Sequence, residues 1–169
     1  MNEQAIVELL ERLGSRYYGK YRGVVVDVDA ATMRIKATVP AVLGDQQTGW
    51  CAPCVPYAGK DVGFAFLPEH GSGVWIEFEA GDVSFPIWTG CYWRDGEVPA
   101  DAKADVKVIV TAGKNKIVLD DSAPSITVSD DSGNQVTLDS NGIKLDRDGK
   151  NVLVSASKVD VNGGALEVI

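Results

Sequence analysis

From residue 106 onward, the chain repeats one short pattern, in which aliphatic residues occupy every second position and small polar turns follow. The turns are rich in Asp, Asn, Ser and Gly, and the units recur about every 7 to 11 residues, which is typical of repeat architectures. The alternation predicts strands with one aliphatic face. No aromatic residue follows Trp93. A single copy of this segment therefore has little with which to cover its own aliphatic face.

This shortage constrains how residues 106–169 can fold, because an isolated ribbon of strands leaves its apolar face and its edges open. Three copies that wind about one axis bury the aliphatic residues in a thin central core and pair the edges. We therefore predict an intertwined, triple-stranded β-helix in a homotrimer, with a monomeric sheet packed on the preceding domain as the alternative. The residues expected in the trimer core are Val106, Val108, Ile117, Leu119, Ile126, Val128, Val136, Leu138, Ile143, Leu145, Val152, Val154, Val159, Val161, Leu166 and Val168.

The same alternation assigns a set of mostly polar residues to the water-facing side of the strands. These residues are Lys107, Thr127, Thr137, Lys144 and Asp160. Three aliphatic residues, Ile109, Val118 and Leu153, do not fit the alternation. Aspartate in place of Val136 or Leu138 would bring three charges together on the axis, so we expect it to prevent trimer formation.

Residues 17–95 carry period-2 apolar runs that Gly and Pro interrupt at short intervals. One of these runs contains Phe64 and Phe66 and predicts a short strand near Val62. Five short strands with no intervening helix predict a small all-β barrel of the OB type. Trp50, Trp75, Trp88 and Trp93 all lie in this segment and are interpreted as its core and rim. The alternative is a platform on which nucleotide bases stack, as in other OB barrels.

Two short segments flank this domain. Residues 1–16 predict an amphipathic helix, which either packs on its own domain or docks on a partner. Its apolar stripe comprises Ile6, Leu9, Leu10 and Leu13. Residues 96–105 are interpreted as a linker between the barrel and the repeat.

The charge and the metal-ligating residues argue against nucleic-acid binding and against a metal or cofactor site. The sequence contains 16 Lys and Arg and 24 Asp and Glu, and the resulting net charge of −8 repels phosphate. Cys51 and Cys54 form a C-x-x-C pair, for which only Cys91 and His70 remain as further zinc ligands, so we interpret the pair as buried barrel cysteines. Residues 146–149 faintly resemble a calcium loop but lack its distal Glu, which indicates a tight turn.

Catalysis finds little support in the sequence. Glu77 and Glu79 are the nearest approach to paired carboxylates, but they lie two apart and are expected on one side of a strand. Glycosidases require carboxyl groups on opposite sides of the scissile bond. The sequence therefore predicts a protein that is not an enzyme.

Six motifs in the barrel segment occur in an order and spacing that resemble a known family. They are residues Tyr21–Val25, Arg34–Pro40, Gly49–Gly59, Phe64–Glu69, Gly73–Asp82 and Pro86–Gly90. They resemble the OB domain of central spike proteins of contractile injection machines, namely the phage baseplate spike, baseplate assembly protein V and the VgrG-type spikes of type VI secretion. The C-terminal repeat is similar to the triple-stranded β-helix of the same family.

This resemblance implies a structural role in a virion or an extracellular tail particle that is assembled in the bacterial cytoplasm. It implies a homotrimer whose OB end sits on the tail hub and whose β-helix pierces the outer membrane of the target cell. An alternative from another class stays open, an OB module that binds oligosaccharide or single-stranded nucleic acid on a trimeric stalk.

The sequence departs from some family members at two places. Only residues 94–105 separate the barrel from the repeat, so the lysozyme domain that some phage spikes carry there is not expected. The last residues contain no His, so the iron site of some spike tips is not expected either. The chain stops on an aliphatic strand, and we expect a separate tip protein of the PAAR type to cover the small apolar surface.

Overall fold

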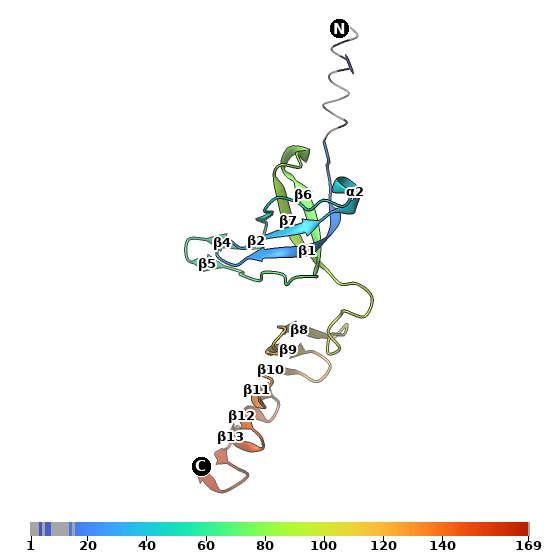
Figure 1. Ribbon diagram of the computed structural model, residues 1–169. Helices are drawn as coiled ribbons and strands as arrows, with labels where there is room; N and C mark the ends of the chain where they lie inside the picture. Colours follow the sequence, from blue (N-terminus) through green and yellow to red (C-terminus); the bar gives the residue numbers. More distant parts are fainter. Residues whose placement is uncertain (1–3, 5, 8–13, 15, 169) are drawn as a thin grey trace. The chain divides into compact units, whose positions relative to one another are not determined.

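The computed structural model describes residues 4, 6–7, 14 and 16–168, apart from the side chain of Glu167. The chain divides into two compact units with the boundary between Glu97 and Val98, and both are built mainly of strands (Figure 1). Most of the helix predicted over residues 1–16 lies outside the described residues, including Leu9, Leu10 and Leu13. Among the described helices, none is long and apolar enough to span a membrane.

The first unit is organised around a five-stranded sheet with the strand order β2-β1-β6-β7-β3. Neighbouring strands are antiparallel, except that β3 runs parallel to β7. The strands of this sheet are β1 (Tyr21–Asp29), β2 (Arg34–Thr38), β3 (Ala52–Pro53), β6 (Gly73–Phe78) and β7 (Pro86–Tyr92).

Residues 47–52, which lead into β3, pair with strands on both sides of the sheet, β2 and β7. On one side, isolated bridges pair Gln47 with Thr38 and Cys51 with Ile35 of β2. On the other side, Ala52 pairs with Ile87 of β7. The sheet therefore curls around one interior, which gives the unit its OB-like form.

The interior of this unit is filled by side chains that alternate along the strands. Along β6, Val74, Ile76 and Phe78 are buried, while the intervening side chains are partly exposed. This is the period expected when one sheet face covers a core. The complete buried cluster comprises Val25, Ile35, Ala37, Val39, Cys51, Val74, Ile76, Phe78 and Trp88.

Two details of the first unit differ from the sequence prediction. A one-turn helix, α2 (Pro40–Leu43), follows β2 where no helix was expected, because Pro40 fits the first helical position, where its missing N–H costs no hydrogen bond. Phe64 and Phe66 were expected in a strand, but only β4 (Ala58–Gly59) and β5 (Val62–Gly63) pair there. This ladder ends with the hydrogen bond from Phe64 N to Tyr57 O, 2.9 Å long.

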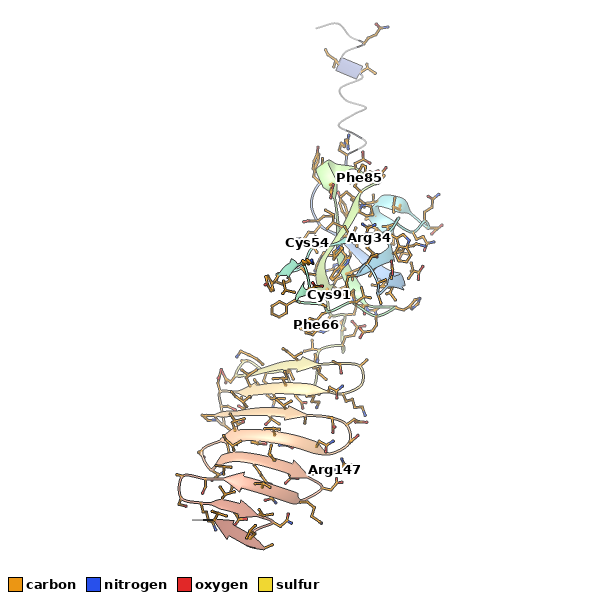
Figure 2. All side chains as sticks on the ribbon, turned by 90° about the vertical axis from the view of Figure 1, so that its left-hand side faces the viewer. Arg34, Cys54, Phe66, Phe85, Cys91 and Arg147 are labelled. Carbon is orange, nitrogen blue, oxygen red and sulfur yellow. The ribbon has the colours of Figure 1, made fainter. Side chains whose placement is uncertain are left out.

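The second unit is an eight-stranded antiparallel sheet in which each strand pairs with the next one along the chain (Figure 2). The predicted β-helix needs three chains, and one chain by itself forms a continuous antiparallel meander. The strands are β8 (Val106–Val110), β9 (Lys116–Asp120), β10 (Ser125–Ser129), β11 (Asn134–Asp139), β12 (Gly142–Arg147), β13 (Lys150–Val154), β14 (Val159–Val161) and β15 (Leu166–Val168).

Candidate functional site

The strand register of the second unit aligns its aliphatic residues in two continuous columns from β9 to β15. Residues within a column face one another across neighbouring strands on one side of the sheet, which we call the aliphatic face. The first column comprises Leu119, Ile126, Leu138, Ile143, Val154, Val159 and Val168. The second column comprises Ile117, Val128, Val136, Leu145, Val152, Val161 and Leu166.

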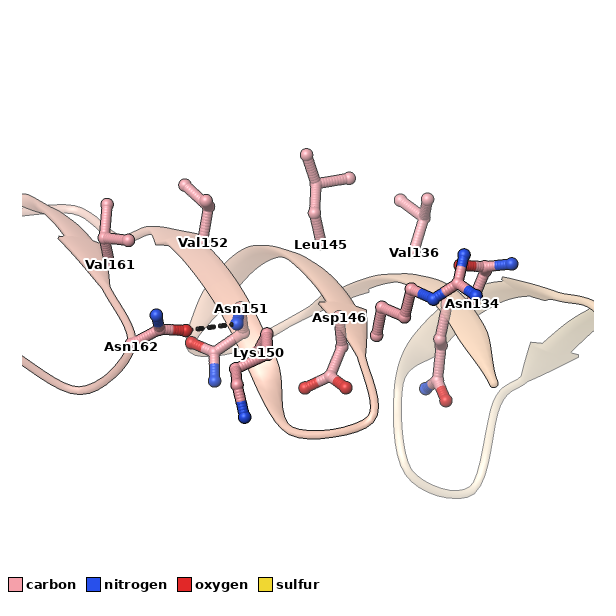
Figure 3. A pocket seen from close by; sticks show the side chains of 11 residues that line it. Asn134, Val136, Leu145, Asp146, Lys150, Asn151, Val152, Val161 and Asn162 are labelled. Carbon is pink, nitrogen blue, oxygen red and sulfur yellow. Dashed lines mark hydrogen bonds between the residues drawn. The ribbon is translucent and has the colours of Figure 1, made fainter. Parts of the chain in front are cut away.

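The aliphatic face is largely uncovered in one copy. The exposed fraction is 38% at Ile117, 52% at Leu145 and 60% at Leu166. In Figure 3, Val136, Leu145, Val152 and Val161 of the second column point to the same side of the strands. Soluble monomers rarely expose a contiguous apolar surface of this kind, so the face is suited to contact with another chain.

In β8, the apolar residue on the aliphatic face is Ile109, not the predicted Val106 or Val108. Ile109 lies level with Ile117, and Lys107 lies level with Leu119. Val106 and Val108 lie on the opposite face, where Val108 pairs with Val118. The structure thus brings together all the predicted core residues except Val106 and Val108, and it adds Ile109.

The opposite face carries most of the side chains predicted to face water, with Thr127, Thr137 and Lys144 in register across β10, β11 and β12. Lys107 lies instead on the side of the aliphatic face, level with Leu119. Leu153, which did not fit the alternation, lies on the opposite face between Lys144 and Asp160. The prediction that Asp160 faces water is wrong, because only 7% of this residue is exposed. The turn after β14 folds back on it, and the Gly164 N–H donates to Asp160 Oδ1 at 3.0 Å.

Polar side chains border the second column at the ends of the strands and form the rim of an open groove (Figure 3). Arg147 Nη1 donates to Asn134 Oδ1 at 3.3 Å, which links the ends of β12 and β11. The Asn151 N–H donates to Asn162 Oδ1 at 2.8 Å and links the next pair. These contacts hold the strand ends in register while the groove above them stays apolar.

The three cysteines occupy different environments. Cys51 is buried, its sulfur lies 3.2 Å from Thr48 Oγ1, and burial raises the pKa of its thiol. Cys54 is exposed, so the prediction of two buried cysteines is wrong for this residue. The two residues lie three apart on an extended segment, and such residues point to opposite sides. Cys91 is exposed as well, although burial of part of its thiol and the charge of Glu69 raise its pKa.

The other candidate ligands and carboxylates are dispersed. Among the residues that the structure describes, no group of three or more His, Cys, Asp or Glu could hold a metal ion. Glu77 forms an ion pair with Lys20 at 2.9 Å, whereas Glu79 lies beyond β6 in a short 3-10 helix (Glu79–Gly81). His70 is exposed, and the Asp146 carboxylate accepts the N–H of Gly149 in a tight turn.

Groups of the protein itself contact three of the four tryptophans that a stacking platform would use. Trp88 is buried in the core, and its ring N–H donates to Met33 O at 3.1 Å. Lys36 Nζ lies 4.4 Å from the centre of the Trp50 ring, and the guanidinium of Arg22 lies 5.6 Å from the centre of the Trp75 ring. These rings are therefore engaged within the unit, which argues against a platform for nucleotide bases.

Comparison with known protein families assigns both units. Residues 21–93 match a family model described as the type VI secretion system/phage-baseplate injector OB domain. Residues 107–167 match the model of the phage baseplate V C-terminal trimerisation domain. No curated protein matches the chain.

An OB domain followed by a trimerisation domain defines a class of structural baseplate proteins related to the spikes of phages and type VI secretion systems. This chain belongs to the phage baseplate assembly protein V family, and the resemblance noted in its sequence is confirmed. The second match also supports a homotrimer.

Proposed function

We propose that three copies of this chain form the central spike of a phage-like contractile baseplate. In this proposal the OB unit docks on the tail hub, and residues 106–169 wind into a three-chain β-helix that pierces the outer membrane of the target cell. The observation that carries the proposal is the pair of aliphatic columns, which one copy leaves exposed and which coincide with a trimerisation domain.

The proposed mechanism is mechanical and requires no catalytic group. Sheath contraction drives the spike forward, so the spike must resist unfolding under axial load. The strands of the second unit are joined by a ladder of backbone hydrogen bonds from β8 to β15, each of which contributes modestly by itself. Winding with two further copies distributes the load over three such ladders and buries the columns between them.

The last strand is the proposed seat of a separate tip protein of the PAAR type. Leu166 and Val168 on β15 are each 60% exposed and lie at the end of the two columns. Three copies would present them as a small apolar triangle, and surfaces of this kind usually have a partner.

Leu138→Asp tests the trimer against a matched control, Thr137→Asp, on the same strand. Leu138 lies in the first column of the aliphatic face, and three unpaired carboxylates on the axis are costly to bury. Thr137 lies on the opposite face, so its substitution should leave the trimer intact. Sedimentation of the full chain should show loss of the trimer for Leu138→Asp alone, and an intact Leu138→Asp trimer would contradict the proposed core.

The spike role itself requires a measurement on particles. Tails assembled with the Thr137→Asp chain should contain it at the baseplate and should kill or infect target cells as the parent tails do. Tails assembled with Leu138→Asp should lose this activity. Baseplates that function normally without a trimeric form of this chain would refute the piercing role.

A further inference from the structure

The first unit carries an exposed aromatic ribbon that the predicted core did not include. It consists of β4, β5 and the residues on either side, and its large apolar side chains are Tyr57, Val62, Phe64 and Phe66. Between 50% and 59% of each of these residues is exposed. The rings of Phe64 and Phe66 stack with their centroids 6.3 Å apart and their planes 27° from parallel.

This ribbon has little to stabilise it within its own unit. β4 and β5 pair only with each other, and their four residues are all exposed. A two-stranded ribbon is marginally stable in water by itself, and a cluster of exposed aromatic side chains marks an interaction surface. The ribbon is therefore expected to be covered in the assembled protein.

The position of the ribbon favours another copy of the chain as the covering surface. The segment after Phe66 leads to Gly71, whose carbonyl accepts a hydrogen bond of 2.8 Å from Arg94, where the chain leaves the unit. Figure 2 shows Phe66 at the opposite end of the unit from Phe85. Phe66, at the end of the ribbon, thus lies at the end of the unit from which the chain leaves, while β4 and β5 project from its side (Figure 1).

The homotrimer holds the exit ends of three OB units close to one another. Residues 94–105 span at most about 40 Å when fully extended, and a tether of this length gives an effective concentration in the millimolar range. The chain as a whole carries a net charge of −8, which makes the copies repel. Within the ribbon, the charges of Lys60 and Asp61 cancel, so this surface can approach another copy without that repulsion.

We propose that the aromatic ribbon packs against the OB unit of a neighbouring copy, so that three ribbons clasp the three OB units into a ring. The ribbon then fixes the OB units relative to one another. This inference rests on the homotrimer and not on hub docking or membrane piercing. The clasp can therefore fail while the proposed function stands, and hub docking or piercing can fail while the clasp stands.

Hydroxyl-radical footprinting of the isolated full-length trimer tests the clasp without any substitution. Phe85 is the internal reference, because it is 58% exposed, Phe66 is 59% exposed, and the two lie at opposite ends of the unit. Oxidation of Phe64 and Phe66, measured by mass spectrometry, should be several-fold lower than that of Phe85. Equal oxidation of the three residues overturns the proposal.

Two further measurements identify the covering surface. In the monomeric Leu138→Asp chain, oxidation of Phe64 and Phe66 should rise to that of Phe85. Tryptophan fluorescence verifies that the OB unit of this chain is folded, because all four tryptophans lie in that unit. Protection that persists in the monomer places the ribbon on its own chain and overturns the proposal. Protection that is absent from the trimer and appears only when purified tail hub is added assigns the ribbon to the hub and also overturns it.

A paired substitution tests the consequence for the assembly. Phe64→Ser combined with Phe66→Ser should leave the trimer intact in sedimentation but increase its radius of gyration in small-angle scattering, because the OB units separate. Phe85→Ser is the matched control and should change neither quantity. An unchanged radius of gyration in a folded double variant contradicts the clasp.

Discussion

At the scale of single residues, the first strand shows how a face is assigned when both sides carry aliphatic residues. Val106, Val108 and Val110 alternate with Lys107 and Ile109, so the pattern alone permits either face. The turn between β8 and β9 decides the register, since the Thr111 N–H donates to Asn115 O at 3.0 Å and places Ile109 opposite Ile117.

This register makes Ile109 a testable member of the trimer core. Ile109→Asp places a carboxylate on the aliphatic face and should lower the thermal stability of the trimer strongly, because a buried unpaired charge costs several kilocalories per mole. Val110→Asp is the control, since Val110 lies on the opposite face, where it pairs with Lys116, the ion-pair partner of Asp101. Calorimetry that finds the same loss for both variants would contradict the assigned face.

At the scale of elements, side-chain hydrogen bonds in the turns hold neighbouring strands in register. Asp130 is the clearest case, because its Oδ1 accepts the N–H groups of Ser132 and Asn134 at 2.8 and 3.0 Å. Its Oδ2 accepts from Asn134 Nδ2 at 2.6 Å. Aspartate and asparagine at such positions favour a turn over a continued strand.

Substitution of this aspartate should therefore loosen the β10–β11 turn. Asp130→Ala removes all three acceptor contacts and should lower the melting temperature of the trimer by a measurable amount. Asp131→Ala removes only an exposed ion pair with Lys114 at 3.4 Å and should have a much smaller effect, since exposed pairs contribute little. Equal melting temperatures for the two variants would show that the carboxylate does not fix the turn.

The same contacts set the pH dependence of the turn. The hydrogen bond from the Asn134 side chain, with those from the backbone, lowers the pKa of Asp130. Because the folded pKa lies below the unfolded value of about 4, the stabilisation is present above that pH and is lost as the pH falls through the folded pKa. The melting temperature of the parent chain should fall in this acid range, with a weaker dependence in Asp130→Ala.

The sequence predicted the strands of the second unit and which residues share one side of β9 to β15, because a single period governs both. From Ile117 to Val168 every position of the two columns is aliphatic, so strand register follows from turn position, although Val118 and Leu153 add aliphatic residues to the opposite face. Asp160 was assigned wrongly because its burial depends on a turn that folds back over the strand, which periodicity does not encode. Phe64 and Phe66 follow strand periodicity but have no strand beside them, so local pattern alone placed them in a sheet.

At the scale of the whole molecule, the two units differ in how they obtain a core. The OB unit buries its own cluster around Ile35 and Ile76, each of which is fully buried in one copy. In the second unit, by contrast, the only buried residues among those described are Val106 and Asp160, and both lie off the aliphatic face. Folding of the first unit is therefore expected to be possible within one chain, whereas that of the second depends on association.

This dependence predicts an asymmetry between unfolding and refolding of the homotrimer. In the proposed β-helix, three wound chains cannot separate without unwinding, so dissociation should be slow, should not depend on protein concentration, and should leave an intact trimer in detergent at ambient temperature. Refolding of the second unit requires chains to meet, so tenfold dilution should slow it steeply. Recovery of the OB unit, followed by the fluorescence of its four tryptophans, should stay unchanged. Circular dichroism and fluorescence after dilution from denaturant measure the two phases. A refolding rate of the second unit that is independent of concentration would mean that a single chain can bury both aliphatic columns, and the trimeric core would have to be abandoned.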